Sequence, residues 1–340
     1  GMEYPTLFTA GTRLFNPFGG GSPEGVTVHE AGHQFWYGIV GNNEFEHAWL
    51  DEGFNTFSTA RTMEVAYGER MLVRRYLSLP GMRSGFIPVL FEDLKFSRMV
   101  GGNRLDGYRS AATSDAQATP TYEYFPKTGG RLSYDKTALW LSTLERYLGW
   151  ETLQKILSTY FQRFQFKHPK PQDFFDVADE MSGQDLSWFF DRVYRSSNDF
   201  DYAVESVASE ALELKGFAEK EGTLAYIEPE EGEPEMYRTE VVVRRYGGAT
   251  FPVDVLMVFE DGEEIRKEWD GESRWELYVE ERPAKLSYAV VDPERKLLLD
   301  LYYTNNSRRL ESRAALPAGK WGSKWMIWLQ DLLATFAFFI

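Results

Sequence analysis

The chain carries two histidines and two glutamates at spacings that suit a catalytic metal centre. His29, Glu30 and His33 form an H-E-x-x-H, and Glu52 follows after eighteen intervening residues. Histidines four residues apart on a helix lie one turn apart, with about 5–6 Å between their Cβ atoms. Both imidazoles can therefore reach one zinc ion at about 2.0–2.1 Å. A carboxylate from Glu52 on a second helix would complete a His2Glu set that leaves one coordination position open, which is typical of catalytic zinc sites.

Glu30 is rotated off the ligand pair on the same helix. It can face a water molecule that the metal activates, so its predicted role is that of a general base. The alternative is that His29 and His33 are helix histidines without a role in metal binding. The chain has only four histidines, and two of them fall in this pattern. This favours a metal site, and with it a hydrolase.

On these residues the chain resembles the M1 family of zinc aminopeptidases, also called gluzincins, whose H-E-x-x-H-x18-E pattern it matches. Gly1-Met2-Glu3-Tyr4-Pro5 resembles the family's G-x-M-E-N exopeptidase motif, and Ser133-Tyr134-Asp135-Lys136 resembles its catalytic tyrosine motif, Y-E-K-G. The three motifs occur in the family's order. The resemblance covers residues 1–200 firmly and the remainder loosely.

The resemblance implies one zinc ion as cofactor and a peptide with a free N-terminus as substrate. Glu3 would hold the substrate's α-amino group, and Tyr134 would donate a hydrogen bond to the oxyanion near the transition state. The alternatives are a solvated terminal residue for Glu3 and an aromatic residue packed at a helix start for Tyr134. We expect Asp51 to support the site or the fold, and His47 and His168 to be structural and surface residues.

The chain also departs from the family pattern. Tyr4 replaces the asparagine of the exopeptidase motif, Thr137 replaces the glycine after Lys136, and Thr59 stands where relatives often place an acidic residue. Loss of a residue that hydrogen-bonds a metal-binding side chain typically lowers metal affinity or activity 10–100-fold. The family's N-terminal β-domain has no counterpart here, so we expect a fragment that binds zinc and is weakly active or inactive.

Two other functions fit the same residues. A thermolysin-type endopeptidase shares the zinc helix, although Glu3 and Tyr134 argue against it. A zinc-bound but non-catalytic binding or scaffold module would use the C-terminal half of the chain as a contact surface.

Composition narrows the class of protein. Of the 340 residues, 43% are hydrophobic and 16% aromatic, which provides for sizeable cores and excludes a disordered chain. The formal net charge of −15 argues against non-specific binding to nucleic acid. Without cysteine, disulfides and thiolate metal sites are excluded.

The expected fold is a multidomain α+β protein. A thermolysin-like, mostly helical catalytic domain covers 1–200, an antiparallel β-sandwich covers 201–310, and an apolar amphipathic helical tail covers 311–340. Apolar spacing and glycine stops predict helices before and after a loop-rich stretch at 81–130. The predicted helices are 24–41, 49–67, 69–78, 131–148, 151–164, 172–181 and 185–195.

Short segments rich in Val, Tyr, Leu and Phe, separated by turn pairs such as Asp261-Gly262 and Asp270-Gly271, predict the strands of the sandwich. The predicted strands are 239–246, 251–260, 263–269, 274–281, 284–291 and 296–303.

The tail carries a broad apolar stripe at helical spacing that includes Trp321, Trp325, Trp328, Phe339 and Ile340. From Trp325 the stripe is shorter than the roughly 20 apolar residues of a membrane span. Three interpretations of what this apolar stripe contacts stay open: a groove of the same chain, a partner surface or the missing N-terminal domain, and a membrane interface.

Overall fold

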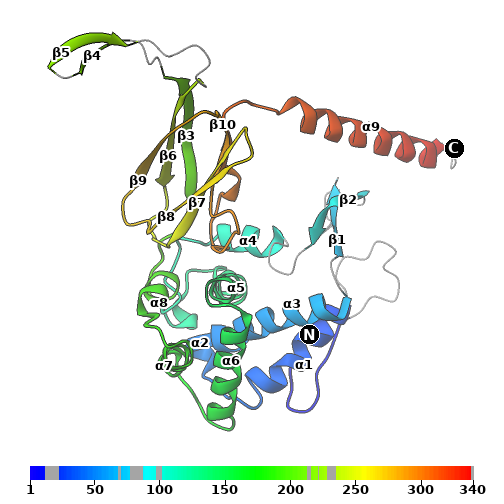
Figure 1. Ribbon diagram of the computed structural model, residues 1–340. Coiled ribbons are helices and arrows are strands. Elements are labelled where there is room, and N and C mark those ends of the chain that lie inside the picture. The colour runs from blue at the N-terminus through cyan, green and yellow to red at the C-terminus, as the bar shows by residue number, and fades with distance from the viewer. Residues whose placement is uncertain are drawn as a thin grey trace.

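The computed structural model describes residues 1–11, 23–67, 70–76, 87–96, 102–212, 216–220, 222–227 and 235–337 (Figure 1). It combines a helical half with antiparallel sheets, so the prediction of a mixed α+β protein is confirmed. The parts of the predicted loop at 81–86 and 97–101 and the tail residues 338–340 lie outside the described residues.

The other helices of the first half lie to one side of the two that carry the metal-binding motif, to their left in Figure 1. Gly149, with a positive φ of 85°, ends α5 and precedes α6, and Gly183 ends α7 in the left-handed region. The helices are α1 (Pro23–Trp36), α2 (Glu44–His47), α3 (Glu52–Tyr67), α4 (Gly102–Arg109), α5 (Thr137–Leu148), α6 (Trp150–Phe164), α7 (Pro171–Ser182) and α8 (Ser187–Val193).

The first helix is shorter than the predicted 24–41. The backbone N–H of Gly38 bonds to the carbonyl of His33 at 2.7 Å, and that of Val40 bonds to the carbonyl of Phe35 at 3.1 Å. These bonds span five residues, so the chain leaves the α-helical pattern before it reaches Gly41. The second motif helix is likewise preceded by a separate 3-10 turn, η1 (Ala48–Leu50).

An aromatic core holds the helices together. Trp49 stacks against Phe175 with ring centroids 6.0 Å apart, and it meets Trp140 edge-on at 5.6 Å. Phe54 of α3 packs edge-on against Phe174 of α7 at 4.8 Å. Because Trp49 and Phe54 flank Glu52 in the sequence, this core fixes the start of α3, where the third proposed ligand lies.

Two predictions for 69–130 are wrong. Residues 70–76 form strand β1 (Arg70–Tyr76) instead of a helix, and they pair antiparallel with β2 (Ile87–Phe96), which lies within the predicted loop together with α4. The register shifts between Met71 and Leu72, so the pairing contains a bulge or irregularity. Cross-strand pairing overrides the moderate helix propensity of Arg, Met and Leu here.

Besides a two-stranded hairpin, the described residues of the second half form two larger antiparallel sheets (Figure 1). One has the order β3-β6-β9 and the other β11-β10-β7-β8. Alternate side chains are buried along β6 and β7, for example Val241, Val243, Val255 and Met257, as expected for sheets with one face on a shared core. The strands are β3 (Tyr202–Ala211), β6 (Tyr237–Arg245), β7 (Val253–Phe259), β8 (Glu264–Trp269), β9 (Trp275–Arg282), β10 (Leu286–Val291) and β11 (Ser307–Arg309).

The strand predictions fail at four places, one of which is β11, where no strand was predicted. Residues 296–303 form turns that lead into a 3-10 turn, η4 (Tyr303–Asn305), because the buried carboxylates of Asp292 and Asp300 accept backbone N–H groups that a strand would pair with its neighbour. Strand β3 was not predicted. Neither was the hairpin of β4 (Gly216–Lys220) and β5 (Thr223–Ile227).

Polar contacts join the helical half to the sheets. Thr143 of α5 accepts the backbone N–H of Leu298 at 3.1 Å in a buried position. Arg192 of α8 donates to the hydroxyl of Thr250 at 2.5 Å and to Glu272 at 2.9 Å. The two halves are therefore connected through the loops at the base of the sheets.

The chain ends in helix α9 (Ala315–Ala337), which runs out to the side from the sheets (Figure 1). Most of its described side chains are exposed, so they do not fill a groove of the same chain. The described part of the chain contains no helix with both the length and the apolar character that crossing a bilayer requires.

Candidate metal and active site

Helices α1 and α3 come close enough for their side chains to meet because glycine lies at each contact. A Cβ on Gly32 would overlap the Oδ1 atom of Asn55 on α3. A Cβ on Gly53 would overlap Thr137 and lie 2.6 Å from the carbonyl oxygen of Ser133. The glycines of H-E-A-G-H and D-E-G-F thus set the spacing among α1, α3 and the segment before α5.

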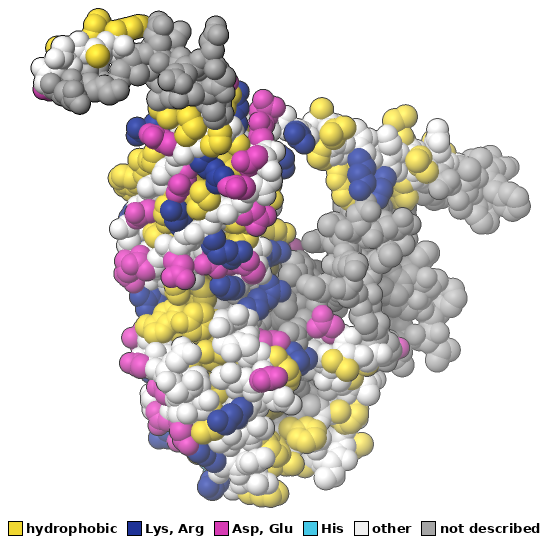
Figure 2. All heavy atoms as spheres, in the orientation of Figure 1, with side chains coloured by type: hydrophobic (Ala, Val, Ile, Leu, Met, Phe, Trp, Pro, Cys, Tyr) yellow, Lys and Arg dark blue, Asp and Glu magenta, His cyan; other side chains and the backbone are white. Residues whose placement is uncertain are grey.

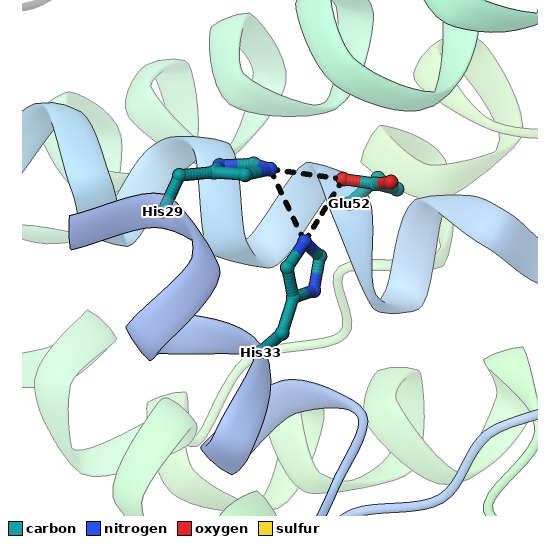
Figure 3. A group of neighbouring side chains, drawn as sticks. All are labelled: His29, His33 and Glu52. Atoms are coloured by element: carbon teal, nitrogen blue, oxygen red, sulfur yellow. Dashed lines mark hydrogen bonds and ion pairs between the residues drawn. The ribbon is translucent and has the colours of Figure 1, made fainter. Parts of the chain in front are cut away.

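The three proposed ligands converge on one point (Figure 3). The Nε2 atoms of His29 and His33 are 3.2 Å apart, and they lie 3.1 Å and 3.3 Å respectively from Oε2 of Glu52. His33 is buried, while His29 and Glu52 are partly buried. The structure therefore brings together, within one hydrogen-bond distance, the atoms that sequence spacing predicted as a ligand set.

Asp51 orients the His33 ring through Nδ1, the ring nitrogen that faces away from the other proposed ligands. Its Oδ1 lies 2.6 Å from Nδ1 of His33, and both side chains are almost fully buried. Burial lowers the pKa of His33, but the hydrogen bonds and charges of Asp51 and Glu52 outweigh this and raise it. Burial raises the pKa of Asp51. A partner on the far ring nitrogen fixes the tautomer and leaves Nε2 facing the site.

Glu52 receives hydrogen bonds from both sides. Burial raises its pKa, but hydrogen bonds from His29, His33 and Tyr134 outweigh burial and lower the pKa to about 2. The carboxylate is therefore anionic across the physiological range. The Tyr134 hydroxyl donates to Oε1 of Glu52, and burial together with this carboxylate raises the pKa of Tyr134. Tyr134 stays protonated and remains a hydrogen-bond donor.

Tyr134 is placed by a π-helical segment, η3 (Arg131–Lys136), directly before α5. Single π turns occur frequently at functional sites because they re-aim a side chain within a helix. Asp135 anchors this segment by accepting hydrogen bonds from Arg104 at 2.7 Å and from Arg131 at 3.4 Å. Thr137, the first residue after η3, accepts a hydrogen bond from the side-chain amide of Gln117 at 2.5 Å. The threonine in place of the family's glycine therefore has a structural partner.

Glu30 and Glu3 lie beside the ligands. Glu30 is buried, its Oε1 is 3.2 Å from the amino group of Gly1, and its Oε2 has no hydrogen-bond partner among the described residues. One carboxylate oxygen of Glu3 lies within 4.8 Å of ligand-type atoms of both Glu30 and His33. The segment that carries Glu3 is attached to α1, since Gln34 accepts the N–H of Thr6 at 3.1 Å.

Sequence reasoning missed Asn55 and Gln34 as supports of the site. Asn55 donates to the backbone carbonyl of His29 at 2.6 Å, which ties the first ligand to α3. No short motif marks either residue, although both lie one turn from a motif residue. Of the other histidines, His47 pairs with Glu46 at 3.7 Å and His168 bonds the carbonyl of Gly41 at 2.6 Å, both outside the ligand group.

The residues fit a zinc ion. The donor set of two imidazoles and one carboxylate is that of catalytic zinc sites. One ring nitrogen of His33 is held by a carboxylate, as is usual for metal-ligating histidines. Glu30 also presents a buried oxygen without a partner among the described residues, which is an unsatisfied acceptor next to the ligands.

Comparison with known proteins agrees with these features. The model of the peptidase family M1 domain matches residues 22–193, half of the chain. The chain belongs to peptidase family M1. The resemblance predicted from the three motifs is thus confirmed at the level of the family.

The relatives cover the same half of the chain. Aminopeptidase M1-B of Oryza sativa subsp. japonica is 26% identical over 160 residues, which span 47% of this chain and 16% of that protein. Mitochondrial aminopeptidase 2 of Saccharomyces cerevisiae is 24% identical over 161 residues, 47% of this chain and 15% of the relative. The chain thus spans about a sixth of the length of these curated relatives.

Two of the solved structures that resemble the chain are aminopeptidase A and an M1 zinc metallopeptidase. Legionella pneumophila aminopeptidase A in complex with aspartic acid has a TM-score of 0.45 and 14% identity, with 82% of this chain and 26% of that chain covered. An M1 zinc metallopeptidase from Deinococcus radiodurans bound to a Tyr-Ser-Ala substrate has a TM-score of 0.33 and 17% identity, with 48% and 32% covered.

Proposed function

We propose that the chain is the catalytic part of a zinc-dependent aminopeptidase that removes N-terminal residues from peptides. One observation carries the proposal: two imidazoles and a carboxylate meet within 3.3 Å, next to a buried glutamate and a tyrosine hydroxyl from a third segment. Membership of family M1 and relatives named as aminopeptidases support it.

In this proposal, His29, His33 and Glu52 hold one zinc ion. Bound there, zinc would polarise the scissile carbonyl and lower the pKa of a water molecule towards ~7. Glu30 takes the proton of the attacking water and passes it to the leaving amine.

Two further residues act on the substrate. Tyr134 turns its hydroxyl from Glu52 to the developing oxyanion, where a preorganised donor stabilises charge that exists only near the transition state. Glu3, next to Glu30, holds the free α-amino group of the peptide.

The proposal also assigns parts of the chain. Residues 1–200 form the catalytic unit, 201–310 the sheet domain and 311–340 a tail. The catalytic unit is thermolysin-like in this assignment, because one helix carries H-E-x-x-H and a second helix carries the third proposed ligand.

The test compares free and N-acetylated aminoacyl anilides as substrates of the purified, zinc-loaded chain. Cleavage of the free form alone supports an aminopeptidase, and equal cleavage of both would indicate an endopeptidase. Glu30→Gln should lower kcat by about 10²–10⁴-fold and leave one zinc per chain. Tyr134→Phe should also lower kcat, because it removes the hydroxyl proposed to donate to the oxyanion. Tyr122→Phe, at an exposed tyrosine outside the group of proposed ligands, is its matched control. A biological activity that survives Glu30→Gln would favour a scaffold over a peptidase.

A further inference from the structure

The C-terminal helix α9 carries its tryptophans and its lysines on different sides. At about 100° per residue, Trp321, Trp325, Trp328, Leu329 and Leu333 share one side, and Lys320 and Lys324 fall on the other. The apolar side is partly exposed, since Trp325 is 39% exposed, Leu329 49% and Leu333 60%. The exposed face is thus larger than scattered single hydrophobic residues would give.

Basic residues gather where α9 leaves the sheets. Residues 307–330 contain five basic side chains and one acidic side chain, a net charge of +4 in a chain whose net charge is −15. A hollow of about 870 Å³ at the root of α9 is lined by Arg308, Arg309 and Arg313 together with Leu310 and Leu316. Figure 2 shows hydrophobic and basic side chains along the described part of α9. This region therefore has the charge opposite to that of the rest of the chain.

We propose that α9 and the arginines at its root form a docking surface for an anionic phospholipid bilayer. Helices with an apolar face, tryptophans and a basic polar face lie in the plane of the membrane interface. Tryptophan is enriched at that depth because its ring is apolar and its N–H is polar. Trp321 and Trp328 lie on the flank of the apolar side that is nearest Lys324, so the rings and the ammonium groups would sit at headgroup level.

The shape of the molecule suits this partner. The 23-residue helix is about 34 Å long at about 1.5 Å per residue, and it runs away from the sheets (Figure 1). The helix therefore offers a flat surface one long contact, which continues into the arginines at its root.

The test is co-sedimentation of the whole chain with vesicles of phosphatidylcholine alone and with added phosphatidylglycerol. We expect stronger binding to the anionic vesicles and weaker binding at high salt. Lys320→Gln and Lys324→Gln should each weaken anionic binding about fivefold and leave binding to neutral vesicles nearly unchanged.

Leu329→Glu should weaken binding to both kinds of vesicle at least tenfold, because a leucine that enters the bilayer in this proposal is replaced by a charge. Ile327→Glu is the matched control. Ile327 is 59% exposed and lies on the lysine side of α9, so this variant makes the same charge change outside the apolar face. Equal effects of the two variants would overturn the assigned orientation of the helix.

Analytical ultracentrifugation without lipid separates the membrane from a second copy as partner. A dimer that Leu329→Glu dissociates, in a chain that binds neither vesicle, would overturn the proposal in favour of self-association. Unchanged circular dichroism and thermal unfolding would show that each variant is folded, and we expect this because the substituted side chains are exposed or partly exposed in the native chain.

Discussion

At the scale of single residues, the support of His33 by Asp51 is the contact that most directly affects the proposed metal centre. The Oδ1 atom of Asp51 lies 2.6 Å from Nδ1 of His33, and the pair is buried. If His33 binds zinc, Asp51→Asn should weaken zinc affinity about 10–100-fold. Competition against a fluorescent chelator measures the change. Asp191→Asn, at an exposed ion pair on α8, is the control, and equal affinities of the two variants would contradict the role of Asp51.

The grouping of the three proposed ligands was predictable from sequence because it depends only on helical spacing and one carboxylate at a fixed distance. Asp51 could be placed near the site for the same reason. The role of Asn55 could not be predicted, since its bond to the carbonyl of His29 exists only where α1 crosses α3. The aim of Tyr134 depends on a π-helical turn that no sequence pattern indicated.

Lys136 gives a second prediction at the residue scale. Its side chain is fully buried, its Nζ lies 3.3 Å from the carbonyl of Ser196, and burial lowers its pKa to about 8. An unfolded lysine has a pKa of about 10.4. Between these values the unfolded chain binds more protons than the folded one, so this residue makes stability rise with pH. Below pH 8 the lysine is charged in both the folded and the unfolded chain. Its unfavourable contribution to the free energy of unfolding is then at its largest and no longer changes with pH.

Lys136→Met should therefore raise the free energy of unfolding at pH 7 by about 1–3 kcal/mol, after subtraction of the lost hydrogen bond. The difference between the variant and the wild type should shrink as the pH rises from 8 to 10. Urea unfolding at several pH values measures this difference. The contributions of other titrating groups cancel in it, because they are the same in the variant and the wild type. A gain that does not change with pH would show that Lys136 is not buried as a charge.

At the scale of elements, the contact between α3 and η3 depends on the absence of a side chain at Gly53. A Cβ there would overlap Thr137 and approach the carbonyl of Ser133 to 2.6 Å. Gly53→Ala should lower the free energy of unfolding by about 1–3 kcal/mol, the usual cost of overpacking. Gly130 has helical φ and ψ and open space around it, so Gly130→Ala is the control and should be neutral or stabilising. Urea denaturation of both variants provides the comparison.

Sequence patterns predicted the elements unevenly. Helices α5 and α6 were located by leucine spacing and by Gly149, because local signals and tertiary packing agree there. Strand β1 was taken for a helix, since Arg, Met and Leu favour helices and its partner β2 lies more than ten residues away. Turns at 296–303 were taken for a strand because the carboxylates that organise them, Asp292 and Asp300, are not hydrophobic signals.

At the scale of the whole molecule, the order of a helical half followed by antiparallel sheets was predictable from the change of composition near residue 200. The way in which the halves meet was not. Contacts such as Arg109 with the carbonyl of Leu301, or Thr143 with Leu298, join residues far apart in the sequence. These contacts follow from packing between the halves, which leaves no local pattern in either segment.

Thr143 tests whether the two halves unfold together. Its hydroxyl donates to the carbonyl of Leu139 at 2.9 Å and accepts the buried N–H of Leu298 at 3.1 Å. Thr143→Val keeps the shape and leaves this N–H without a partner, at a cost of about 1–3 kcal/mol. If the halves form one cooperative unit, a single calorimetric transition should move down by about 2–4 °C per kcal/mol. Thr143→Ser retains the hydroxyl and should restore most of the loss. Two separate transitions, of which only one responds to Thr143→Val, would show that the sheets and the helices unfold independently across this contact.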